Sequence, residues 1–187
     1  MANSKRSSTT GHQLQLALVI SMALVGAAAS TTTKHFHFYM HDTVTASPGN
    51  PSTVVQVTTG TTPLPGAPTT RFGDIYVVDD LLTKGPSPAS EAVGRAQGFY
   101  LFAAQHELAV MHSLNFVLTK GKHNGSYVVI QARDAIADKV RELPVIGGAG
   151  RFRGATGYIL LRTHLFNSTT NNAVLEIDMY LTNLSVV

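Results

Sequence analysis

Two aspartates stand where an alternating pattern predicts a buried carboxyl. Asp42 shares its parity with the apolar Met40. Asp134 shares its parity with Ile130 and Ala132, so it extends a small, apolar face. Burial in an apolar cavity raises the pKa of a carboxyl and keeps its proton available, which is what a general acid requires. The alternative for each residue is an exposed aspartate that caps a turn at the end of a strand.

Three histidines suggest a second kind of chemistry. His35, His37 and His41 alternate along one strand face with Tyr39, and alternate strand residues can converge on one metal ion. A carboxylate on the same face would complete such a site, but Asp42 has the opposite parity. We therefore interpret these histidines as surface or subunit-packing residues and expect neither a metal ion nor a cofactor. The chain has no cysteine, which excludes a thiolate metal site and a cysteine nucleophile.

The neighbouring acids Asp79 and Asp80 resemble a catalytic pair at first sight. Adjacent residues of a strand point to opposite faces, so both carboxyls cannot address one substrate atom. We interpret both as structural. Arg95 and Gln97 share one parity and could line a pocket, but we favour a role in fixing a strand interface.

Alternation with period two recurs along the chain and predicts an all-β domain. The strand candidates are Phe36–Met40, Val54–Thr58, Asp74–Asp79, Arg95–Ala104, Leu108–Leu118, Ser126–Arg133, Gly157–Phe166 and Ala173–Leu184. Eight antiparallel strands favour a closed barrel, with a sandwich as the alternative.

Three stretches fall outside this pattern of alternation. The proline-containing segments Pro48–Arg71 and Leu82–Glu91, which show little alternation, are expected to be long loops. Gly147, Gly148 and Gly150 are expected to form a tight loop, because no helical pattern follows them that would make a phosphate cradle.

The N-terminus has the pattern of a signal peptide. Lys5 and Arg6 precede an apolar run, Leu14–Ala29, that ends in small residues. We expect cleavage after residue 29 and one mature domain, 30–187; an uncleaved anchor is the alternative.

Removal of the two basic residues leaves a net charge of 12 − 11 = +1, from 14 basic and 11 acidic residues in the whole chain. No basic stripe is present, so a nucleic-acid partner is not expected. Acceptor sequons predict glycosylation at Asn124, Asn167 and Asn183.

Five sequence blocks follow one another along the chain: FYMHD (Phe38–Asp42), VVDDLLT (Val77–Thr83), VGRAQGFY (Val93–Tyr100), NGS (Asn124–Ser126) and RELPVIGGAGRFRGATGY (Arg141–Tyr158). In this order they closely resemble the plant dirigent family. The similarity extends over nearly the whole mature chain. It implies an eight-stranded antiparallel β-barrel with a mostly apolar central pocket, secretion to the apoplast and cell wall, and a homotrimer or, as older descriptions have it, a dimer.

The resemblance also implies a function. Family members bind small phenolic substrates or radicals and do not oxidise them: an external laccase or peroxidase makes coniferyl alcohol radicals, whose coupling to lignans the dirigent protein directs. A second branch, similar to pterocarpan synthases, dehydrates an isoflavanol. The third alternative is a defence-related pocket protein without chemistry. No membrane association is expected after cleavage of the signal peptide.

The site residues that the resemblance implies are four. Both chemistries pass through a quinone methide, and the family's two pocket acids fall on Asp42 and Asp134. Arg141 matches the family's pocket arginine, and Tyr100 matches a pocket tyrosine that can hydrogen-bond a substrate phenol. Leu81 stands where the family usually has proline, and such departures leave the exact substrate open.

Overall fold

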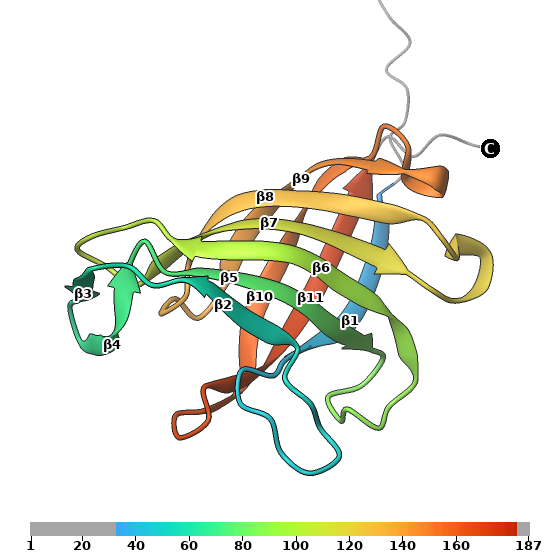
Figure 1. The fold of residues 1–187 in the computed structure, drawn as a ribbon. Helices are drawn as coiled ribbons and strands as arrows, with labels where there is room; N and C mark the ends of the chain where they lie inside the picture. Colours follow the sequence, from blue (N-terminus) through green and yellow to red (C-terminus); the bar gives the residue numbers. More distant parts are fainter. Residues whose placement is uncertain (1–32, 183–187) are drawn as a thin grey trace, which may run out of the picture. The chain divides into compact units, whose positions relative to one another are not determined.

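A computed structural model describes residues 33–182, and within them the regular structure is almost entirely β (Figure 1). Two short 3₁₀ helices, η2 (Gly121–His123) and η3 (Gly150–Phe152), interrupt the strands. The strands are β1 (Lys34–Asp42), β2 (Val54–Thr58), β3 (Thr62–Leu64), β4 (Ala67–Phe72), β5 (Ile75–Thr83), β6 (Ala92–Phe102), β7 (Ala109–Leu118), β8 (Tyr127–Ala135), β9 (Arg141–Ala149), β10 (Thr156–Asn167) and β11 (Asn172–Thr182).

Eight of these strands form a closed antiparallel β-barrel. Their order around the barrel is β1, β11, β10, β9, β8, β7, β6 and β5, and the pairing of β5 with β1 closes the circle. The first half of β5 pairs instead with β2, which is a ninth strand outside the closed circle. The barrel confirms the prediction from the alternating pattern and excludes the sandwich.

The set of barrel strands differs from the predicted set in one member. Val54–Thr58 was expected among the eight, whereas the missing strand is β9, Arg141–Ala149. Gly147 and Gly148 belong to this strand, so the expected tight loop is wrong there; it begins only at Gly150. Gly148 is needed for close packing, because a Cβ at this position would lie 2.6 Å from the carbonyl oxygen of Phe152. The expectation of a long loop at Pro48–Arg71 is wrong over much of its length, because this segment contains β2 and most of the hairpin of β3 and β4.

The barrel interior is filled at one end and hollow at the other. Phe152 is fully buried and packs against Phe36 and His123, with ring centroids 5.8 and 5.0 Å apart. This cluster closes the end of the barrel where β1 begins. At the opposite end Asp42 is the register partner of Ala173, and both residues line a cavity.

Asp79 and Asp80, both predicted to be structural, lie on opposite faces of β5. Asp79 is exposed, while Asp80 is 1% exposed on the opposite side of β5. The Asp79 carboxylate accepts hydrogen bonds from Arg95 Nε at 2.7 Å and Gln97 Nε2 at 3.2 Å on the neighbouring strand. These residues fix a strand interface, as expected, and do not line a pocket.

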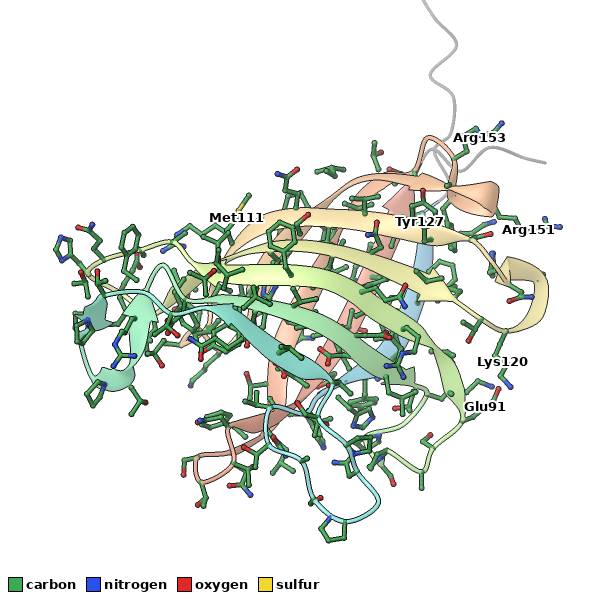
Figure 2. The ribbon with its side chains drawn as sticks, in the orientation of Figure 1. Glu91, Met111, Lys120, Tyr127, Arg151 and Arg153 are labelled. Carbon is green, nitrogen blue, oxygen red and sulfur yellow. The ribbon has the colours of Figure 1, made fainter. Side chains whose placement is uncertain are left out.

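Apolar side chains are exposed on the same outer face. Val55, Val77 and Phe99 are successive register partners across β2, β5 and β6, and they are 61%, 47% and 41% exposed. Met111 and Tyr127 lie on the outer face of β7 and β8 (Figure 2). Across residues 33–182, no helix has the length and hydrophobicity to cross a membrane.

Candidate functional site

A cavity of about 880 Å³ occupies the hollow end of the barrel. Its size is in the range of pockets that bind small molecules. The aromatic and aliphatic part of its wall includes Tyr76, Phe102, Leu108, Val110, Ile136 and Leu175. Asp42, His112, Asp134 and Arg141 also line it, so three of the four predicted site residues reach the same space.

Asp134 lies in a cluster with one arginine and one histidine. Its Oδ2 is 3.1 Å from Nε2 of His112, and its Oδ1 is 3.2 Å from Nε of Arg141. The arginine contact is an ion pair without hydrogen-bond alignment, because neither Oδ1 nor Nε has a hydrogen-bond partner. Asp134 is 2% exposed, so it is not the exposed strand-end aspartate of the alternative interpretation.

Local strand geometry explains why these side chains meet. The β7–β8 register makes Val110 the partner of Asp134, so His112 lies two positions along the same inner face. Pairing between β8 and β9 ends at Ile130 and Val145, so Arg141 lies in the part of β9 that is not paired with β8. Nη1 of Arg141 donates to the carbonyl of Ile136 at 2.9 Å and to Oγ1 of Thr163 at 3.0 Å. Arg141 therefore connects the β8–β9 loop to β10 beside the cavity.

Asp42 approaches the cavity from β1. Its Oδ1 is buried and has no hydrogen-bond partner, although the residue as a whole keeps some exposure toward the cavity. Burial raises the pKa of Asp42 to about 6. A carboxyl with an unpaired oxygen and a raised pKa holds its proton into the mildly acidic range, as a general acid must.

Tyr100 lies behind the cavity wall rather than in it. Its ring stacks on Tyr76, with centroids 5.0 Å apart, and lies 5.8 Å from the ring of His112. Burial, with the charge of Asp42 second, raises the pKa of Tyr100 well above its usual value, so its hydroxyl stays a hydrogen-bond donor. The tyrosine that lines the cavity is Tyr76, which the sequence analysis did not single out.

Sequence reasoning also missed two titratable groups near the site. His112 stands among apolar residues on the buried parity of β7, and that position was the available signal. Asp80 was interpreted as structural, but it faces the interior and its pKa is raised to about 8 by burial and by the charge of Asp42.

The histidines of β1 have two different environments. His41 is 6% exposed, and its Nε2 lies 2.7 Å from Oγ1 of Thr83, so its interpretation as a surface residue is wrong. His35 and His37 are on the outer face and both contact Oδ1 of Asp178, at 2.8 and 2.9 Å. The strand β5 covers only the end of β1 that carries His41, which explains the difference.

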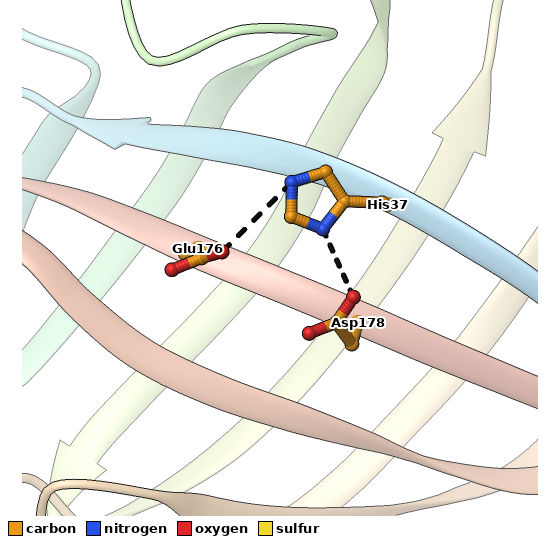
Figure 3. A group of neighbouring side chains, drawn as sticks. All are labelled: His37, Glu176 and Asp178. Atoms are coloured by element: carbon orange, nitrogen blue, oxygen red, sulfur yellow. Dashed lines mark hydrogen bonds and ion pairs between the residues drawn. The ribbon is translucent and has the colours of Figure 1, made fainter.

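His37, Asp178 and Glu176 form the group of potential metal ligands found within residues 33–182 (Figure 3). His37 directs Nδ1 to Asp178 and Nε2 to Glu176, at 2.9 and 3.9 Å, so its two nitrogens face different carboxylates. Arg162 donates to the second oxygen of Asp178 at 2.8 Å. This arrangement is that of a hydrogen-bonded ion cluster.

Two of the predicted glycosylation sites are accessible. Asn124 is exposed at the end of η2, and Asn167 is exposed at the end of β10, where its Oδ1 accepts from the backbone of Thr169 at 2.9 Å. Asn183 and the predicted signal peptide, 1–29, lie outside the described residues.

A closed antiparallel barrel around a cavity with buried carboxyls and an arginine is an architecture with room for a small molecule. The chain belongs to the dirigent family, since the family described as dirigent-like protein matches residues 33–182.

Individual relatives agree with this assignment. The chain is 42% identical to dirigent protein 21 of Arabidopsis thaliana, over 90% of this chain and 93% of that protein. It is 36% identical to pterocarpan synthase 1 of Glycyrrhiza echinata, over 78% and 76%. The solved structure of the pterocarpan synthase dirigent protein GePTS1 superposes with a TM-score of 0.74 at 33% identity, covering 83% of this chain and 92% of that one.

Proposed function

We propose that this protein directs the coupling of phenoxy radicals that a separate laccase or peroxidase makes from monolignols such as coniferyl alcohol. The observation that carries the proposal is the convergence of Asp42 and the Asp134–His112–Arg141 cluster on one cavity of about 880 Å³. Such a cavity can hold aromatic rings in a fixed orientation and exclude water. The substrates' phenolic rings would lie against Tyr76 and Phe102.

The acid has a defined task in this chemistry. Coupling of two radicals forms a carbon–carbon bond and leaves quinone methides. A carboxyl of the protein gives its proton to the quinone-methide oxygen. A hydroxyl of the coupled substrate then adds to the quinone-methide carbon and returns a proton to the carboxylate. Asp42 suits the proton-donating role, because its Oδ1 is unpaired and burial raises its pKa to about 6. The Asp134–Arg141 ion pair suits stabilisation of the charge that develops on a bound oxygen.

A second candidate function is dehydration of an isoflavanol, supported by the similarity to pterocarpan synthases. Here the same carboxyl protonates the departing hydroxyl, the carbon–oxygen bond breaks, and water leaves. The carbocation that remains, which is the protonated form of the quinone methide, is closed by addition of a phenol oxygen, whose proton returns to the carboxylate. This reaction needs no oxidase.

One set of incubations separates the candidates. Coniferyl alcohol with a laccase, with and without the purified protein, is followed by chiral chromatography; a changed enantiomer ratio supports radical coupling. Consumption of an isoflavanol by the protein alone supports dehydration. Binding of either compound without an effect on products supports the pocket protein without chemistry, and contradicts both proposals.

The assembly and the location are further parts of the proposal. The row of Val55, Val77 and Phe99 is exposed apolar surface, which a second copy of the chain would cover in a homotrimer or dimer. The signal-peptide pattern supports export, and N-terminal sequencing of secreted protein should begin close to Ser30. Recovery of Met1 on a membrane-retained product would contradict export and glycosylation together.

A further inference from the structure

Asp80 lies directly behind Asp42 in the barrel interior. β1 pairs with β5 through Met40 with Leu82 and His41 with Leu81. The next position of this antiparallel register places Asp42 opposite Asp80, on the inner face that Met40 and Leu82 share. Residues opposite each other in such a pair have Cβ atoms about 4.5–5.5 Å apart. Of the two acids, Asp42 lines the cavity and Asp80 does not.

The surroundings of the two carboxyls supply few partners for negative charge. Oδ1 of Asp80 accepts a hydrogen bond of 2.5 Å from Oγ1 of Thr53, and Oδ1 of Asp42 has no partner. Within residues 33–182 neither carboxyl forms an ion pair, in contrast to Asp134. Two adjacent buried carboxylates without a counter-ion repel each other strongly, so at least one proton is retained.

We propose that Asp80 is a positioning residue that acts through Asp42: the two carboxyls form a pair that shares one proton, and Asp80 keeps that proton available to the cavity through Asp42. The chemical use of the proton rests on the proposed function, but the pair itself does not depend on it. The role of Asp80 is thus to extend the pH range over which the site holds an acid.

The titration of the pair gives the proposal a quantitative form. Burial raises the pKa of Asp42 to about 6, and burial followed by the charge of Asp42 raises the pKa of Asp80 to about 8. These values belong to the pair, which loses its first proton near 6 and its second near 8. Between these values one proton remains for the two carboxyls.

Other groups that act on the pair come from three neighbouring elements. Arg95 of β6 opposes and Asp79 of β5 reinforces the rise in the pKa of Asp80, although both lie on the outer face. Tyr100 of β6 faces both acids from inside, and its own pKa is raised, so it remains neutral. The Thr53 hydrogen bond, from the segment before β2, lowers the pKa of Asp80.

The test combines Asp80→Asn with its neighbour Asp79→Asn as the matched control. Asp79 is exposed on the outer face, so Asp79→Asn removes the same single charge as Asp80→Asn but leaves both carboxyls of the pair in place, with only the small electrostatic contribution of Asp79 lost. Carboxyl titration by NMR, on protein labelled at aspartate carboxyl carbons and without substrate, should show a step near pH 8 in the wild type. Asp80→Asn should remove that step and leave one near 6, while Asp79→Asn should retain both.

Activity gives the second measurement. The upper limb of the pH profile of the product-directing activity should move from about 8 to about 6 in Asp80→Asn and stay in place in Asp79→Asn. Thr53→Val, which keeps the size of the side chain and removes the hydrogen bond, should move the upper titration step to higher pH and provides the test if Asp80→Asn does not fold. A wild-type titration without the upper step, or one that Asp80→Asn and Thr53→Val leave unchanged, overturns the pair. The pair observed by NMR in a protein without activity would instead contradict only the proposed function.

Discussion

Arg141 and Asp134 are paired at the buried wall of the cavity, with Nε of the arginine 3.2 Å from Oδ1 of the aspartate and exposures of 5% and 2%. Each side chain supplies the main opposite charge for the other, because a buried charge without a partner is costly. The arginine also donates hydrogen bonds to Ile136 and Thr163, so the ion pair is held in place by two other parts of the cavity wall.

Removal of the arginine should therefore destabilise the protein through Asp134. Arg141→Met keeps a long side chain but leaves the aspartate buried beside His112 alone, and we expect a loss of about 3–5 kcal/mol in the free energy of unfolding. The double variant Arg141→Met/Asp134→Asn should recover part of this loss. Chemical denaturation measures both. The control is Arg133→Met, at an exposed position on β8 next to Asp134, and this change should affect stability little.

Stability should fall as the pH rises through the titration of the buried acid pair. The pKa values of Asp42 and Asp80 are raised in the folded protein to about 6 and 8, above the unfolded value near 3.8. A carboxyl whose pKa is higher in the folded than in the unfolded protein contributes stability that is fully present below the pKa of the unfolded state. This stability is lost as the pH rises through the pKa of the folded state.

Melting temperatures measured from pH 4 to pH 9 test this sign. The wild type should lose stability over the whole interval between about 4 and 8, and Asp80→Asn should lose little above about 6. A melting temperature that rises from pH 5 to pH 8 would contradict the raised values.

The exposed row on β2, β5 and β6 predicts an effect on assembly. Val77→Lys places a charge in the middle of the row, between Val55 and Phe99, and should shift the protein toward monomer in sedimentation or light scattering. Val140→Lys, exposed in the β8–β9 loop and outside the row, is the control. A wild-type protein that sediments as a clean monomer would remove the basis for the assembly.

Alternation in the sequence predicted the inner and outer faces of the strands, and with them the inward position of Asp42 and Asp134. It did not predict the partners, because these depend on register between distant strands. His112 meets Asp134 through the β7–β8 register, and Asp80 lies behind Asp42 only because β1 closes the barrel on β5. β9 was missed for a local reason, because Pro144, Gly147 and Gly148 have low strand propensity. Pro144 is tolerated because pairing with β8 ends at Val145, and Gly148 is required because Phe152 packs closely against it.

The most direct test of the site concerns the two aspartates that were predicted as site residues, Asp42 and Asp134. Asp134→Asn keeps the size of the side chain and removes the charge that pairs with Arg141 and His112. If Asp134 stabilises a quinone-methide intermediate, the rate or selectivity should fall about 10²- to 10⁴-fold with little change in substrate binding. Asp42→Asn should have a similar effect through loss of the donated proton. Asp138→Asn, at the exposed rim of the same cavity, is the matched control.

The double variant Asp42→Asn/Asp134→Asn shows whether the two residues act together. If both act on one intermediate, the double variant should lose less than the product of the two single effects, because residues that act as a unit are not additive. Circular dichroism establishes that each variant is folded, and product analysis on the true substrate gives the rate and the enantiomer ratio. A folded Asp134→Asn protein with wild-type selectivity and turnover would make Asp134 a bystander, and multiplicative effects in the double variant would assign the two aspartates to separate steps.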